Sequence, residues 1–441
     1  MNRLLLLLGL VGSALSGARA QTPNFSAVDA LLTTNLARYN GSVVCLVKQG
    51  NRLVYYRALG TLDSLSVVPI ASATKNITAA VVLRLAQEGV LGLDDSIGTY
   101  LPRATFFRKG SSTIRQNFAH TGGWAGTSGE DFLARTNITL AQSVDSILRE
   151  DPQLYRPGTA FKYSGVSMQV GGQCAAVAAG TDWNTLFTTR IKQPLGLSST
   201  TYQLSSPTNP RLAGGINSNA RDLMRFTQFI LRNGKVGTTQ VIDSVWMQEM
   251  WRDQTNRVPQ LASPYPANPT YNNPYNQPVI YYGFGAWQDV YNPTTRYTEQ
   301  LSGAGAFGTI YWVDRCRGIT GVILTQSNYA RVSGVSMQAI DLIRAQIGGG
   351  CSTVTAVRES AATASLTLYP NPAHDRIYLE GPAGPGAEVS VWSVTGQQVA
   401  PPVQLRAGES LPTTGWPAGL YYVRLRVNGG PAGYRKILVQ P

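Results

Sequence analysis

Histidine is almost absent from this chain, which has only two, His120 and His374, in 441 residues. A hydrolase with a serine, histidine and aspartate triad would have to recruit His120, and no G-x-S-x-G segment is present to carry its serine. The four dispersed cysteines complete no metal-ligand spacing with these histidines. The sequence therefore predicts neither a metal site nor a cofactor, and we interpret His120 as a structural residue that anchors a turn before Gly122-Gly123.

Charged residues are also scarce, at 14% of the chain, although 37 Lys and Arg outnumber 24 Asp and Glu. The resulting formal net charge of +13 is spread singly along the sequence and forms no basic block. Nucleic-acid-binding proteins normally gather their basic residues on one face or in one segment. We therefore expect no nucleic-acid partner.

Long apolar runs are missing except at the N-terminus. Arg3 precedes an apolar run from Leu4 to Leu15, and the small residues Ala18 and Ala20 follow it. This pattern is typical of a secretory signal peptide at 1–20, and the run is too short to span a bilayer comfortably. The sequence thus predicts a chain that is secreted or attached to the cell surface, with no transmembrane segment in its mature form.

Strand patterns lie at both ends of residues 21–350, and helical periodicity fills the middle. Two strand-like runs, "GSVVCLVKQ" and "RLVYYRALG", are joined by Gly50-Asn51, and helices are expected from Ser72 to about Gln240. Strand patterns return at "YYGFGAWQ", "RYTEQLSG", "GTIYWVD" and "GITGVILTQ", before a helix that ends near Gly348. This order predicts an α/β (α+β) fold, with one antiparallel sheet built from both ends, flanking helices and an inserted helical subdomain.

The composition changes after Cys351. Residues 351–364 have little apolar periodicity and are expected to form a linker. Short alternating runs separated by Gly and Pro turns fill residues 365–441. They predict a separate small C-terminal β-sandwich.

Four cysteines are too few for a disulfide framework but allow one or two bridges in an exported chain. Cys316 lies in an expected hairpin turn, and Cys351 follows the last helix of the main domain. A strand leaving the turn and a helix returning to it would bring both to one edge of the sheet. We predict a bridge between Cys316 and Cys351, and buried free thiols at Cys45 and Cys174.

A serine and a lysine stand three residues apart in "PIASATK", where a long amphipathic run begins. Helical spacing places Ser72 and Lys75 on one face, so the lysine can act on the serine proton. A serine hydroxyl needs such a base to become a nucleophile, and a helix N-terminus favours the developing negative charge. The S-x-x-K pattern alone is weak, since it also occurs by chance on solvated helices.

The surrounding segments strengthen this interpretation. "PIASATKNITAAVVLRLAQEGVLGLDDSIGTYLP" resembles the nucleophile region of the serine β-lactamase-like superfamily, particularly class C β-lactamases and family VIII carboxylesterases. Further stretches resemble the same family in its order, covering about residues 25 to 348: "TIRQNFAHTGGWAG", "PGTAFKYSGVSMQVGG", "AGGINSNARDLMRF", "YYGFGAW" and "GAGAFGTIYWVD".

The resemblance implies a role for several residues. Ser72 is expected to be the nucleophile and Lys75 its base, while Tyr163 relays the proton between nucleophile and leaving group. Cationic neighbours are expected to lower the pKa of Tyr163. The backbone N–H groups of Ser72 and Ala306 would form the oxyanion hole.

Two departures from the family pattern bear on the substrate. The third motif reads Gly303-Ala304-Gly305, which leaves no side chain to bind a carboxylate, and Gly165 stands where the family commonly has an asparagine that orients Lys75. A different residue would have to fill this gap. These glycines and Ala304 are expected to border the substrate.

The resemblance and the departures together indicate an exported serine hydrolase that forms an acyl-enzyme on Ser72. Its expected substrate is a small-molecule ester or a small amide. Two alternatives stay open: a β-lactamase or D-stereospecific peptidase that binds its carboxylate elsewhere, and a catalytically silent surface protein that keeps the fold for binding.

The segment from Asn256 to Tyr282 is long and rich in Pro, Asn and Tyr. Such loops often form a lid or rim over a site, and Tyr271, Tyr275 and Tyr282 would then contact substrate. The alternative is an ordinary surface loop whose tyrosines pack locally.

The C-terminal segment has a resemblance of its own. "LYPNPAHDRIYLE", "VSVWSVTGQQV", "PAGLYYVRL" and "YRKILVQ" resemble the type IX secretion sorting domain, over about residues 365 to 441. The resemblance implies that the secretion machinery recognises this segment, which is then removed or used for surface attachment. A carbohydrate-binding sandwich is the competing interpretation.

Overall fold

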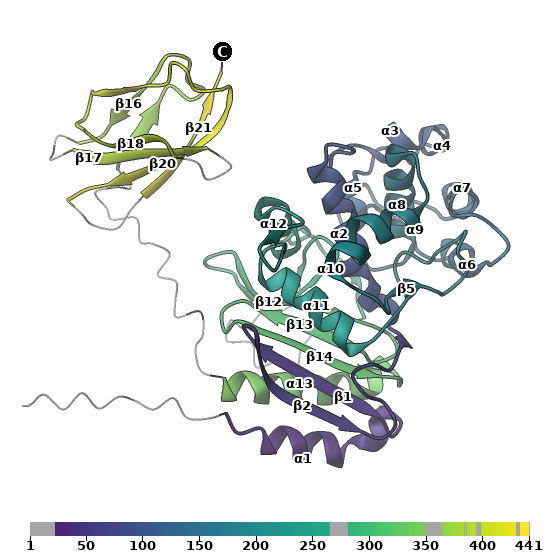
Figure 1. Cartoon of the computed structure of the whole chain (residues 1–441). Helices are drawn as coiled ribbons and strands as arrows, with labels where there is room; N and C mark the ends of the chain where they lie inside the picture. Colours follow the sequence, from purple (N-terminus) through teal and green to yellow (C-terminus); the bar gives the residue numbers. More distant parts are fainter. Residues whose placement is uncertain are drawn as a thin grey trace, which may run out of the picture. The chain divides into compact units, whose positions relative to one another are not determined.

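The computed structural model describes residues 23–264, 281–347, 351, 363, 365–382, 384, 386–393, 398–428 and 433–440 (Figure 1). It divides into two compact units, Met1–Gly349 and Gly350–Pro441. The predicted signal peptide, Tyr271, Tyr275 and most of the predicted linker lie outside the described residues. No helix within the described ranges has the length and apolar character needed to cross a membrane.

A seven-stranded sheet organises the first unit, in the order β10-β11-β12-β13-β14-β1-β2. All of its strand pairs are antiparallel, and β1 joins β14 with Val44 opposite Leu324. This pairing of the two chain ends confirms the predicted sheet. The strands are β1 (Val43–Gln49), β2 (Arg52–Leu59), β10 (Tyr281–Tyr282), β11 (Trp287–Asn292), β12 (Tyr297–Ala304), β13 (Ile310–Asp314) and β14 (Ile319–Thr325).

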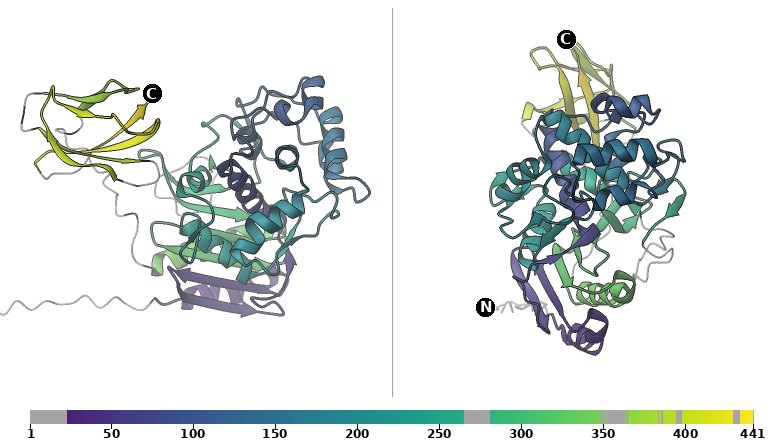
Figure 2. Two further views of the ribbon diagram at one scale, coloured as in Figure 1. Left: turned by 45° about the horizontal axis from the view of Figure 1, so that its top comes forward. Right: turned by 90° about the vertical axis from the view of Figure 1, so that its right-hand side faces the viewer.

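Helices cover both faces of this sheet (Figures 1 and 2). Because strand side chains alternate between faces, Val43, Cys45 and Val47 of β1 pack in the same core cluster as α1 (Ser26–Thr34) and α13 (Tyr329–Gln346). The intervening Val44 and Leu46 belong to the larger cluster on the opposite face. That face carries α2 (Thr74–Gln87), α11 (Ala220–Leu231) and α12 (Ser244–Trp251).

The inserted helical subdomain lies beyond α2 (Figure 1). Helix α2 is buried on all sides from Thr74 to Ala86 except at Arg84, as expected of a helix enclosed between two layers. The subdomain contains α3 (Ile97–Tyr100), α4 (Pro102–Phe106), α5 (Ile114–Phe118), α6 (Gly129–Ala134), α7 (Leu140–Glu150), α8 (Val166–Ala179), α9 (Trp183–Phe187), η3 (Thr188–Lys192) and α10 (Gln193–Leu195). Short strand pairs accompany these helices, namely β3 (Val68–Pro69) and β5 (Thr201–Tyr202) with β6 (Ile216–Ser218), β4 (Phe161–Lys162) with β9 (Gln260–Ala262), and β7 (Lys235–Val236) with β8 (Thr239–Gln240).

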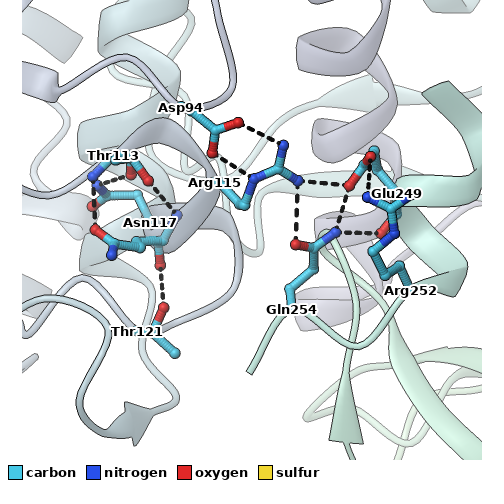
Figure 3. Close-up of polar contacts among 9 residues, drawn as sticks. Asp94, Thr113, Arg115, Asn117, Thr121, Glu249, Arg252 and Gln254 are labelled. Atoms are coloured by element: carbon cyan, nitrogen blue, oxygen red, sulfur yellow. Dashed lines mark hydrogen bonds and ion pairs between the residues drawn. The ribbon is translucent and has the colours of Figure 1, made fainter. Parts of the chain in front are cut away.

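A polar network ties α5 to α12 (Figure 3). Arg115 of α5 binds Asp94 at 2.7 and 3.0 Å and Glu249 of α12 at 2.6 Å. The amide of Gln254 donates to the same Glu249 carboxylate at 2.7 Å. Because both sides of the Arg115 guanidinium are paired, the network fixes α5 and the turn that follows it, which carries His120.

The cysteines follow the prediction. Cys316 and Cys351 are disulfide-bonded, while Cys45 and Cys174 are buried and free. The predicted bridge is therefore confirmed. Glu299 offers a carboxylate within 4.8 Å of both bonded sulfur atoms. Since those sulfurs are joined to one another, no thiolate remains there to bind an ion.

The second unit is a small β domain with two antiparallel sheets, as predicted. One contains β15 (Thr367–Tyr369), β16 (Arg376–Glu380) and β19 (Ser410–Pro412); the other contains β17 (Ala387–Ser393), β18 (Gln398–Leu405), β20 (Gly419–Arg426) and β21 (Gly433–Val439). Apolar residues from both sheets, including Ile377, Val389 and Val423, form one core. Strand β19 was not predicted, because its three residues end in a proline and show no clear alternation.

Candidate active site

Ser72 lies in the short 3₁₀ helix η2 (Ala71–Ala73), immediately before α2. The preceding strand β3 is fixed by its pairing with β6, where Val68 lies opposite Ser218. Ala71 has a φ of 46°, which is uncommon for a residue with a side chain. Such local strain is often found at functional sites, and the next residue, the half-buried Ser72, lines a cavity.

Lys75 is almost completely buried, with 2% of its surface exposed. Its Nζ lies 3.0 Å from Ser72 Oγ and 2.8 Å from the carbonyl oxygen of Ala213. Burial lowers the pKa of Lys75 to about 7; the Glu130 carboxylate opposes this shift and Arg211 reinforces it. A substantial fraction of Lys75 is therefore neutral amine at neutral pH and able to accept the serine proton.

Tyr163 follows β4 and packs against the same pair. Its ring stacks on Trp287 with centroids 5.1 Å apart, and Lys75 Nζ lies 4.5 Å from its centroid. Burial raises the pKa of Tyr163, and its hydrogen bond with Ser72 opposes that effect without reversing it. The predicted lowering of this pKa is wrong, because the cost of burying a phenolate outweighs the hydrogen bond with Ser72, and the nearby charge of Glu130 raises the pKa further. Tyr163 is thus a neutral phenol that can donate a proton.

A cavity of about 280 Å³ opens onto these residues. Its walls include the predicted Ala304, Gly305 and Ala306, together with aromatic side chains that the sequence analysis did not assign to the site. The residues that line it are Ser72, Tyr163, Pro264, Trp287, Ala304, Gly305, Ala306, Asn328, Tyr329 and Ala330. Trp287 was recognised only as part of a strand motif, and no sequence signal distinguished Asn328 or Tyr329.

The segment after β12 presents backbone groups to this cavity. Gly305 N–H donates to Thr309 at 2.9 Å, and the Ala306 carbonyl accepts from Tyr329 N–H at 2.9 Å. Within the described part of the chain, the N–H groups of Ser72 and Ala306 donate no backbone hydrogen bond. Both residues line the cavity, so the predicted oxyanion hole stays a prediction that their positions allow.

Gly303 does not line the cavity, because a neighbouring ring fills its side-chain position. A Cβ atom at Gly303 would lie 2.5 Å from Cζ and 2.6 Å from the hydroxyl of Tyr311. Tyr311 lies opposite Gly303 on β13 and donates to the Ala73 carbonyl at 2.6 Å. Any side chain at Gly303 would therefore meet the ring of Tyr311.

We expect Gly303→Lys to lower the free energy of unfolding by roughly 1–3 kcal/mol, as overpacking of a core does. It should also fail to create cephalosporin hydrolysis, because the new side chain cannot enter the space held by Tyr311. Gly334→Lys is a matched control, since a Cβ at Gly334 meets no atom within 4 Å. Denaturant unfolding compares the variants, and a Gly303→Lys protein as stable as the control would contradict the prediction.

Tyr282 and His120 lie behind the cavity rather than in its wall. Tyr282 is 1% exposed and packs on His120 and Trp287, with centroids 4.9 and 4.7 Å apart. His120 Nδ1 lies 3.0 Å from Ser167 Oγ, and burial beside Lys75 lowers the pKa of His120 well below its ordinary value. The neutral His120 therefore supports Tyr163 from behind, in agreement with a structural role.

Gly165 lies beside the site, at the start of α8, and is not among the residues that line the cavity. Its N–H donates to Glu130 Oε1 at 2.6 Å. Sequence reasoning did not single out Glu130 or Arg211, although both influence the pKa of Lys75.

Comparisons with known proteins identify a family for each unit. Residues 28–345 match the family Beta-lactamase, and residues 367–440 match the family Secretion system C-terminal sorting domain. Protein flp from Staphylococcus aureus is 28% identical over 138 residues, which cover 30% of this chain and 28% of that protein. The D-alanyl-D-alanine-carboxypeptidase/endopeptidase AmpH from Escherichia coli is 27% identical over 186 residues, which cover 37% of this chain and 48% of AmpH. Each match thus spans less than half of the relative's own length.

The fold comparison extends over most of the first unit. A Bacteroides dorei structure with a provisional beta-lactamase assignment has a TM-score of 0.65 at 24% identity and covers 73% of this chain and 100% of its own. At this identity the likeness shows the fold alone.

Proposed function

The chain belongs to the beta-lactamase family of serine hydrolases, and from this premise we propose that it forms an acyl-enzyme on Ser72 during hydrolysis of small-molecule esters or small amides. One observation carries the proposal: Ser72 Oγ lies 3.0 Å from the buried Lys75 amine, at the wall of a cavity. A serine becomes nucleophilic when a base of suitable pKa lies within hydrogen-bond reach.

The proposed reaction begins with neutral Lys75, which takes the proton of Ser72 while Oγ attacks the substrate carbonyl carbon. The backbone N–H groups of Ser72 and Ala306 donate to the oxyanion that forms. The phenol of Tyr163 protonates the leaving group as its bond to carbon breaks, and the Lys75 ammonium returns a proton to Tyr163. Water then attacks the acyl-enzyme by the same route and releases the acid.

The cavity wall favours neutral acyl groups. Tyr163, Trp287 and Tyr329 give it an aromatic surface, and among the described residues that line it no side chain is cationic. Gly303 adds no cation, because Tyr311 occupies its side-chain space. A substrate carboxylate would therefore be desolvated without a partner, which is costly. The cavity therefore favours esters and small amides over β-lactams.

A D-stereospecific peptidase is the second candidate, and the similarity to AmpH favours it. Such an enzyme would need a cation for the carboxylate of its substrate. Arg211, with 37% of its side chain exposed, is a nearby candidate, but the Glu130 carboxylate already accepts from it at 3.2 Å. For this reason we rank the ester and small-amide activity first.

The C-terminal sorting domain makes this a secreted or cell-surface protein. We propose that the secretion machinery recognises residues 365–441 and that this unit takes no part in hydrolysis. The hydrolase domain would then act on substrates outside the cytoplasm.

The test is intact-mass spectrometry of the mature chain after exposure to a fluorophosphonate. We expect one adduct, located on Ser72 and absent from Ser72→Ala. Turnover of a p-nitrophenyl ester should exceed that of a chromogenic cephalosporin. Absence of an adduct under conditions that label a known family member would instead indicate a silent binding protein, whereas faster cephalosporin turnover would favour a lactamase.

A further inference from the structure

The side-chain position at Gly165 is occupied by a carboxylate from another helix. A Cβ atom built at Gly165 would lie 3.0 Å from Oε1 and 3.2 Å from Oε2 of Glu130, in α6. Glu130 Oε1 accepts the Gly165 N–H at only 2.6 Å, a short distance typical of a charged acceptor. The Glu130 carboxylate therefore lies where a longer side chain at Gly165 would begin.

Glu130 is also connected to the segment that holds Lys75. Its Oε2 accepts from Arg211 Nη2 at 3.2 Å, and two residues later the Ala213 carbonyl accepts from Lys75 Nζ at 2.8 Å. Arg211 itself begins a tight turn, in which its carbonyl accepts from Gly215 N–H at 2.6 Å. A single carboxylate thus links the start of α8, beside Tyr163, to the turn beside Lys75.

We propose that Glu130, with Arg211, is a positioning pair that replaces the amide side chain absent at Gly165, holding the Tyr163 and Lys75 segments in register for proton transfer. This inference rests on the proposed hydrolase function. An asparagine would offer both a donor and an acceptor at this point, whereas Glu130 offers acceptors alone and leaves the donor role to Arg211.

The charges of the pair act on Lys75 in opposite directions. Glu130 raises the pKa of Lys75, and Arg211 lowers it. The other side chains that interact with Lys75 are Ser72, the phenol ring of Tyr163 and the neutral ring of His120. Glu130 and Arg211 are therefore the two charged side chains that shift the pKa of Lys75.

The first experiment compares pH profiles of kcat/KM for a p-nitrophenyl ester. Activity that needs the neutral Lys75 should rise with pH through the pKa of that residue. We expect Glu130→Gln to move this rise to lower pH and Arg211→Gln to move it to higher pH, each by about half a pH unit. Asp131→Asn is the matched control, since Asp131 is the exposed neighbour of Glu130 and should leave the profile unchanged.

The second experiment tests the replacement directly. Gly165 has a φ of −79°, so asparagine fits its backbone, but the new Cβ would crowd the Glu130 carboxylate. We expect Gly165→Asn and Glu130→Ala each to lower kcat by about tenfold, and the double variant to recover most of that loss, as contacting residues do. Thermal unfolding of each variant identifies any loss that comes from misfolding.

The outcomes separate the two proposals. If fluorophosphonate does not label wild-type Ser72, the proposed function fails, whatever Glu130 does. If labelling and turnover persist while both charge variants leave the pH profile in place, or the double variant is no better than the singles, the positioning role is overturned. Glu130 would then only cap the start of α8.

Discussion

Replacing Lys75 with methionine will lower kcat/KM for ester hydrolysis by about 10⁴-fold, near the upper limit for loss of a general base. Lys75 Nζ is the group 3.0 Å from Ser72 Oγ, and the raised pKa of Tyr163 makes that phenol a poor substitute base. Methionine keeps the unbranched apolar stem of lysine and lacks only its terminal amine, so the cavity should survive. Lys235→Met, at an exposed lysine, controls for loss of one positive charge.

The same substitution should make the protein more stable near neutral pH. The pKa of Lys75 is lowered from 10.5 to about 7 by burial. Between these values the unfolded chain binds more protons, so wild-type stability rises with pH across that window and carries its full penalty below pH 7. The lowering of the Lys75 pKa corresponds to a stability penalty of about 5 kcal/mol at most. The gain in stability of Lys75→Met should be smaller, because the variant loses the hydrogen bonds to Ser72 and Ala213.

Denaturant unfolding at pH 6 and pH 10 checks this result. The stability of Lys75→Met relative to wild type should be greatest at pH 6 and decline by a few kcal/mol toward pH 10. A difference that does not change with pH would show that Lys75 titrates normally in the folded protein. A base of ordinary pKa would then be largely protonated at pH 7, and the proposed role of Lys75 would have to be revised.

Local patterns were enough to predict the sheet and the first half of the site. Gly50-Asn51 between two strand-like runs is a local hairpin signal. The last strands of the sheet are recognisable as apolar runs in the sequence. Ser72 in η2 and Lys75 in α2 are three residues apart in continuous helical turns, so their contact follows from helical geometry. The C-terminal β domain was predictable for the same reason, since its strands alternate between turn residues.

Contacts between distant segments could not be predicted in this way. Glu130 reaches Gly165 across 35 residues, and Lys75 reaches the Ala213 carbonyl across 138. No sequence periodicity brings these partners together. The sequence therefore showed that Gly165 departs from the family pattern, but it did not indicate that Glu130 lies beside it. The direction of the pKa shift at Tyr163 was wrong because burial is a property of the whole fold, and spacing alone does not reveal it.

Replacing Tyr163 with phenylalanine should lower kcat by about 10²-fold for an alkyl ester and by much less for a p-nitrophenyl ester. The reason is the leaving group. An alkoxide is strongly basic and must be protonated as it departs, whereas p-nitrophenolate leaves without a proton. Because burial raises the pKa of Tyr163, its phenol holds the proton that the alkoxide needs.

The control for this substitution is Tyr282→Phe, which removes a hydroxyl from the same aromatic cluster behind the cavity wall. Tyr282→Phe should lower kcat for the two esters equally and only slightly. An equal, large loss on both esters for Tyr163→Phe would mean that the phenol orients Ser72 through their hydrogen bond instead of protonating the leaving group. The ratio between the two esters therefore distinguishes an acid from an orienting group, because only proton donation depends on the basicity of the departing oxygen.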